Sequence, residues 1–95
     1  MRLSALSLLA IAACAGTPPP ATELAAARAA IERAGPLAAH YAPAELAAAQ
    51  SKLERAEQAL ARDERTQARR LAEEAQVDAR LASAMAENER SRAVR

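Results

Sequence analysis

Residues 46–60 read LAAAQSKLERAEQAL, and this stretch decides the fold. Five of its apolar residues recur at alternating spacings of three and four: Leu46, Ala49, Leu53, Ala56 and Leu60. That spacing places them on one helix face and is typical of a coiled-coil seam, with Leu at a and Ala at d. Pro43 suits the first position of a helix, where its missing N–H is not needed. We therefore expect a helix from Pro43 to about Arg62.

A longer helical pattern follows, from about Glu64 to Arg90. Its apolar stripe consists of small residues: Ala68, Ala72, Ala75, Ala79, Ala82 and Ala86. The larger side chains of Leu71, Leu81 and Met85 flank this stripe. Alanine faces allow helices to approach to about 8 Å, where leucines of a partner helix fill the groove.

The two patterns are complementary in shape, so we expect them to form an antiparallel hairpin. The seam residues would be Leu46, Leu53, Leu60, Leu71, Ala75, Ala79 and Ala82. Arg62-Asp63-Glu64 is the expected turn, although it contains neither Gly nor Pro; the alternative is one continuous helix from Pro43 to about Arg92. The last helix would extend beyond its partner from about Ala84 to Arg95, as a frayed end or a contact surface.

A short first helix is expected from Thr22 to Ala34. Thr22 is a suitable N-cap, and Gly35-Pro36 predicts the end of the helix. Residues 37–42 would form a loose connection to the helix that begins at Pro43. Because β-branched residues are scarce and every long segment has helical periodicity, the predicted fold is all-α.

The N-terminal sequence has the pattern of an export signal. Met1-Arg2 is followed by an apolar run from Leu3 to Ala13 and then by Cys14, the only cysteine. The residues Ile11-Ala12-Ala13 before Cys14 resemble the lipobox of lipoprotein signal peptides. We therefore expect a signal peptide at residues 1–13 and a covalent lipid on Cys14, with acyl chains such as palmitate.

Other interpretations of Cys14 remain open. An ordinary signal peptidase would cleave after Ala15 and leave a soluble periplasmic protein, and a buried structural cysteine is a further alternative. A membrane-spanning helix is disfavoured because the apolar run is too short to cross a hydrocarbon core of about 30 Å.

Lipidation predicts where the chain resides. Ala15, rather than Asp, follows Cys14, which by resemblance to enteric lipoproteins favours the periplasmic face of the outer membrane. Residues 14–21 would then form the lipidated cysteine and a proline-rich tether, since consecutive prolines extend a chain by roughly 3.1 Å per residue. Residues 22–95 would form the helical domain.

The charge balance argues against nucleic acid as a partner. The sequence has 13 Lys and Arg residues, including Arg2 in the leader, and 12 Asp and Glu residues, so the predicted helical domain carries no excess of basic residues. Trp and Phe are absent and Tyr41 stands alone. A small core of Ala and Leu removes little apolar area from water, so self-association or an envelope protein partner would add stability.

The sequence offers no catalytic constellation, and we expect no enzyme activity. A nucleophile needs an adjacent base oriented by a third group, but His40 is the only histidine and lies in a predicted connection. Zinc needs three or four convergent ligands, which one His and one acylated Cys do not supply. Glu73 and Glu74 lie on an exposed helix face, without a cleft. We therefore expect no metal, no cofactor and no small-molecule substrate.

Four arginines cluster near the predicted turn and form the most distinct group of charged residues: Arg62, Arg65, Arg69 and Arg70. One interpretation is that these arginines bind an anionic envelope polymer. The other, which we favour, is that they belong to a solvated face whose charge is balanced by nearby carboxylates. Pairs four residues apart, such as Arg28–Glu32 and Arg70–Glu74, fit that solvated face. His40-Tyr41 would close the first helix onto the second.

Several segments resemble a bacterial envelope family: Tyr41-Ala-Pro-Ala-Glu-Leu-Ala, Lys52-Leu-Glu-Arg-Ala-Glu-Gln-Ala-Leu-Ala, Ala68-Arg-Arg-Leu-Ala-Glu-Glu-Ala and Asp78-Ala-Arg-Leu-Ala. They resemble the domain of unknown function 4398, an Ala-rich helical module of signal-bearing proteins and lipoproteins. The resemblance covers about Thr22 to Arg90 and implies no catalytic residue. Relatives often have Gly-Asp-Tyr in the turn, and some carry an OmpA-like domain after the module, which we do not expect here.

The sequence therefore predicts a small non-enzymatic lipoprotein, acting as a helical structural or protein-interaction module at the outer membrane. The alternative function is binding of peptidoglycan or lipopolysaccharide through the Arg-rich face. A helix lying on the membrane is a third hypothesis, weakened by the absence of Trp and Phe.

Overall fold

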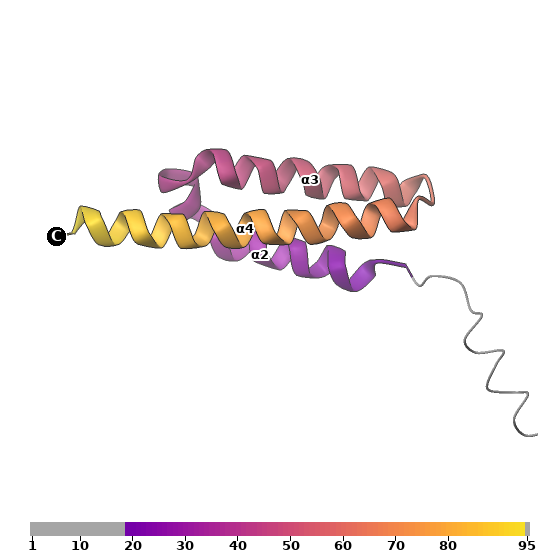
Figure 1. Cartoon of the computed structure of the whole chain (residues 1–95), viewed down its shortest axis with the longest axis horizontal. Coiled ribbons are helices and arrows are strands. Elements are labelled where there is room, and N and C mark those ends of the chain that lie inside the picture. The colour runs from indigo at the N-terminus through magenta and orange to yellow at the C-terminus, as the bar shows by residue number, and fades with distance from the viewer. Residues whose placement is uncertain (1–18, 95) are drawn as a thin grey trace, which may run out of the picture.

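The computed structural model describes residues 19–94, which form three helices. These are α2 (Ala21–Tyr41), α3 (Pro43–Ala61) and α4 (Arg65–Ala93). Figure 1 shows them side by side along one axis, with α3 antiparallel to both α2 and α4. Helix α4 packs against both other helices, which contact each other less. The prediction of an all-α fold with an antiparallel hairpin and a long last helix is confirmed.

A tight turn separates α3 from α4, so the alternative of one continuous helix is wrong. Asp63 has a positive φ of 59°. The N–H of Asp63 donates to the carbonyl of Leu60 at 2.9 Å, and the N–H of Glu64 donates to that of Ala59 at 2.9 Å. These two bonds are those of a Schellman motif, in which glycine usually takes the left-handed position. Asp tolerates this conformation better than most residues, which explains a turn without glycine.

The predicted loose connection at residues 37–42 is wrong, because α2 continues to Tyr41 beyond a kink. Gly35 interrupts the helix with φ 42° and ψ −141°, a conformation that is strained for residues with a side chain. Pro36 then restarts the helix, since the first helical position needs no N–H donor. Ala42 alone separates α2 from α3, with φ −141° and ψ 54°. These angles lie outside the helical region, which is disfavoured for a residue before proline.

The core is made almost entirely of alanine methyl groups. Within residues 19–94, the buried apolar side chains larger than alanine are Pro20, Leu24, Leu46 and Leu71. Leu53 and Leu60 are partly buried and pack against the cluster at the hairpin end of the bundle. At mid-length the core narrows to one alanine from each helix, Ala30, Ala49 and Ala79.

Helix α4 is covered further toward its C-terminus than the sequence suggests. Ala86 is fully buried and packs in one cluster with Ala38 and Ala42, so the overhang does not begin at Ala84. The helical segment after Gly35 supplies this cover, which a loose connection would not. Only the last turns of α4 project beyond the other helices (Figure 1).

We predict that Ala79→Leu destabilises the bundle by about 1–3 kcal/mol, because Ala79 is fully buried against Ala30 and Ala49 and a larger side chain must separate the helices. Ala84→Leu is the matched control, since Ala84 is exposed on the same helix. It should change stability by less than about 0.5 kcal/mol. Urea unfolding followed by circular dichroism measures both, and equal effects of the two substitutions would contradict the close-packed seam.

Gly35→Ala should also destabilise the bundle, by about 1–3 kcal/mol. A Cβ at position 35 would meet no atom within 4 Å, so the loss would report the backbone conformation and not a clash. Thermal unfolding compared with the wild type provides the measurement. An unchanged midpoint would mean that α2 does not hold this kink.

Candidate functional site

The predicted lipidation site lies outside the described residues. Cys14 and the leader at residues 1–13 precede residue 19, as does most of the predicted tether. None of the helices within residues 19–94 combines the length and the apolar character needed to cross a membrane.

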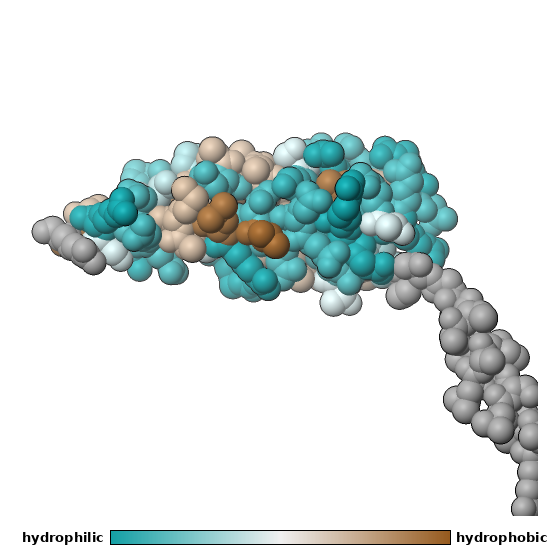
Figure 2. Space-filling model, viewed as in Figure 1, coloured by the Kyte–Doolittle hydropathy of each residue, from teal (hydrophilic) through white to brown (hydrophobic). Residues whose placement is uncertain are grey.

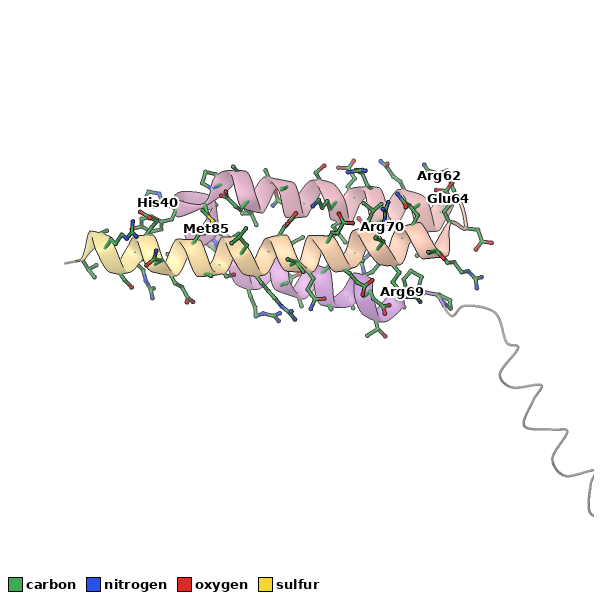
Figure 3. The ribbon with its side chains drawn as sticks, in the orientation of Figure 1. His40, Arg62, Glu64, Arg69, Arg70 and Met85 are labelled. Atoms are coloured by element: carbon green, nitrogen blue, oxygen red, sulfur yellow. The ribbon has the colours of Figure 1, made fainter. Side chains whose placement is uncertain are left out.

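The four arginines near the turn do not converge on one point. Arg62 lies in the turn, because α4 begins only at Arg65, and it is therefore not on the same helix face as the others. Figure 3 shows Arg62 beside Glu64 at the hairpin end, whereas Arg69 lies toward α2 and Arg70 lies on α4 about a turn inward from that end. The predicted polymer-binding group is thus spread over several sides of the bundle.

Each of these arginines has a carboxylate within 4 Å. Arg62 lies 3.2 Å from Glu64, and Arg65 lies 3.0 Å from Asp63, so both pairs close around the turn. Arg69 lies 3.5 Å from Glu23 on α2, and Arg70 lies 3.9 Å from Glu74 one turn further along α4. This arrangement agrees with a solvated, charge-balanced face.

Ion pairs between helices are the polar contacts that sequence reasoning missed. Arg28 Nη2 lies 2.7 Å from Glu57 Oε2, which joins α2 to α3. Lys52 on α3 reaches Asp78 on α4, while the Arg69–Glu23 pair joins α4 to α2. Arg28 therefore pairs across helices and not with Glu32. Spacing along one helix reveals only partners on that helix, so these pairs required the packing to be known.

Lys52 contacts two acids of α4 at once. Its Nζ lies 2.8 Å from Asp78 Oδ2 and 3.5 Å from Glu74 Oε1. The hydrogen bond to Asp78 raises the pKa of Lys52 above its ordinary value of 10.5, and Glu74 adds to this effect. Since both acids are on α4, the ammonium group of Lys52 links α3 to α4 in its charged form only.

His40 and Tyr41 end α2 and form an edge-to-face ring contact with centroids 4.5 Å apart. Tyr41 is half-buried against the cluster containing Leu46, whereas His40 is exposed. Within residues 19–94 no three His, Cys, Asp or Glu side chains gather as metal ligands would.

Helix α4 also exposes a narrow apolar strip. Val77, Leu81 and Met85 are spaced four residues apart and are 61%, 50% and 36% exposed. The space-filling view shows a brown area at mid-bundle, bordered by hydrophilic side chains on one side and by paler apolar residues toward the C-terminal end (Figure 2). Leu81 and Met85 were expected to flank the core, but they project from its edge into solvent.

The Lys52 pairs should contribute stability that depends on pH. A raised pKa in the folded state means that this contribution is complete below the ordinary pKa of 10.5 and is lost as pH rises through the higher pKa of the folded state. Lys52→Arg should keep its charge through that range, since the arginine pKa exceeds about 12. We therefore expect the wild type to lose more stability than Lys52→Arg above this pH in urea unfolding.

Every other alkaline titration is common to both proteins and cancels in this comparison. Lys52 is the only lysine, so NMR of its side chain reports the pKa directly. Parallel pH profiles for the two proteins would show that the contacts with Asp78 and Glu74 are not coupled to folding.

Comparison with known proteins identifies a family for the helical region. The sequence matches the family described as domain of unknown function (DUF4398) over residues 22–95, which includes all three helices apart from Ala21. No curated protein and no solved structure matches the chain. The extent of the family match, over most of the sequence, shows that this chain belongs to the DUF4398 family.

Proposed function

We propose that this protein is a small, non-enzymatic lipoprotein of the bacterial cell envelope, with a helical bundle that acts as a protein-interaction module. The observation that carries the proposal is the N-terminal sequence, where Ile11-Ala12-Ala13-Cys14 follows the apolar run from Leu3. The proposed location is the periplasmic face of the outer membrane.

Physical chemistry supports anchoring through lipid alone. Each buried CH₂ group of an acyl chain contributes about 0.8 kcal/mol, so two or three chains hold a small protein firmly. The bundle then needs no apolar surface of its own to remain on the membrane.

The surface of the bundle supports an interaction role. An alanine core buries little apolar area per residue, and the strip of Val77, Leu81 and Met85 leaves apolar side chains in solvent. A partner protein or a second copy that covered this strip would increase the apolar area buried from water, which is small in the bundle alone.

Binding of an anionic polymer through the arginines of the turn has weaker support. Arg62, Arg65, Arg69 and Arg70 each lie within 4 Å of a carboxylate, which a polymer would have to displace. The interaction module is therefore the function that we favour.

The anchor is tested by expressing the full chain and Cys14→Ser in a Gram-negative host. We expect the wild type to gain the mass of acyl chains and to sediment with outer membranes, and Cys14→Ser to lose both properties. A wild type without acyl mass, cleaved near Ala15 and soluble in the periplasm, would contradict the anchored form.

Chemical crosslinking of the same two strains in the periplasm tests the interaction role. A crosslinked product of defined mass, containing either a second copy or another envelope protein, supports it. The absence of any product in both strains, with the protein present at equal levels, would contradict it.

A further inference from the structure

A groove between α2 and α4 differs from the other charged surfaces of the bundle. It has a volume of about 450 Å³ and is lined by Ala30, Arg33, Arg80, Ser83 and Glu87. Ala30 is 2% exposed and belongs to the mid-length contact among the three helices. The small side chain of Ala30 leaves room between the longer side chains that line the groove.

Neither guanidinium in this groove has an ion pair or hydrogen bond with any of residues 19–94. Other arginines near helix interfaces are paired, as Arg28 is with Glu57 and Arg69 is with Glu23. Arg33 and Arg80 come from different helices but line the same space. Two like charges in one groove repel each other, and an anion between them would relieve that repulsion.

We propose that Arg33, Arg80 and Ser83 form a binding site for a phosphate group. Guanidinium groups donate pairs of parallel hydrogen bonds to phosphate oxygens, and charge-assisted bonds of this kind are about twice as strong as neutral ones. Ser83 is half-buried, and its hydroxyl adds a further donor. A tetrahedral phosphate has enough oxygens to accept from both guanidiniums and the hydroxyl together, whereas a carboxylate has only two.

Glu87 also lines the groove and bears on the strength of the site. Its carboxylate repels an anion and competes with it for the two guanidiniums, so the groove carries two positive charges and one negative charge. Removal of the Glu87 charge should therefore strengthen phosphate binding. If the three charged groups act in one groove, the gain should appear at Arg33 and Arg80 and not at an arginine outside the groove.

Inorganic phosphate is the probe for the first experiment. The full chain, made with Cys14→Ser so that no lipid is added, is titrated at constant ionic strength and followed by NMR of the arginine Nε–H groups. We expect saturable shifts at Arg33 and Arg80. Arg33→Gln or Arg80→Gln should weaken binding about tenfold or more, and Glu87→Gln should strengthen it roughly threefold or more.

Arg55→Gln is the matched control, because Arg55 likewise has no ion pair or hydrogen bond with the described residues but lines a different groove, beside Arg62 and Glu64. It should leave phosphate affinity at Arg33 and Arg80 unchanged. Equal effects of Arg55→Gln and Arg33→Gln, or no gain in Glu87→Gln, would overturn the proposal. Circular dichroism verifies that each variant remains helical, and the gain expected for Glu87→Gln does not depend on variants that lose binding.

Vesicles then distinguish a lipid headgroup from a free phosphate compound. Vesicles containing phosphatidic acid present a phosphate monoester, and pure phosphatidylcholine vesicles serve as the reference. A headgroup ligand is indicated if the protein is retained on the phosphatidic acid vesicles and if Arg33→Gln, but not Arg55→Gln, reduces that retention. Binding of inorganic phosphate without such retention indicates a free phosphate compound, and failure to bind either would overturn the site.

The phosphate site does not rest on the proposed lipid anchor. It depends only on residues of α2 and α4, so either proposal can fail while the other stands.

Discussion

Contact among Ala30, Ala49 and Ala79 is the constraint on which the rest of the structure depends. All three alanines are buried, and small side chains of this kind allow helices to approach to about 8 Å. Close helices bring the residues that flank each seam within reach of one another. Lys52 can therefore contact both Asp78 and Glu74, and Arg28 can contact Glu57. The small core and the ion pairs between helices have the same physical origin.

The kink at Gly35 extends this packing along α4. A helix that ended at Ala34 would leave the second half of α4 without a neighbour on its α2 side. Because Gly35 can adopt φ 42°, the chain changes direction and resumes as a helix at Pro36, which brings Ala38 against the cluster that contains Ala82 and Ala86. The same segment positions Tyr41 and then Ala42, whose carbonyl accepts the N–H of Leu46 at 3.1 Å.

The hairpin could be predicted from the sequence because its signals are local. The spacing of Leu46, Leu53 and Leu60 and the proline at position 43 define α3 without knowledge of any other helix. The segment after Gly35 was missed because Gly-Pro normally ends a helix, and its continuation depends on contacts with α4 that are distant in sequence. The predicted Arg-rich face is divided for a related reason: the Schellman turn at Asp63 places Arg62 outside α4. The groove of Arg33 and Arg80 exists only once α2 and α4 are packed together.

In this bundle the residues that form the core are different from those proposed to bind a ligand. We expect a larger side chain at Ala79 to disrupt the interior, whereas Arg33, Arg80 and Ser83 line a groove at its edge. The ion pair between α2 and α4, Glu23–Arg69, lies near the start of both helices. The groove lies further along the same interface, where two guanidiniums repel each other. A phosphate held there would link α2 to α4 in this second half, and a ligand that binds only the folded state stabilises it in proportion to its affinity and concentration. In a bundle with so small a core, occupancy of the groove would therefore be coupled to the stability of the whole fold.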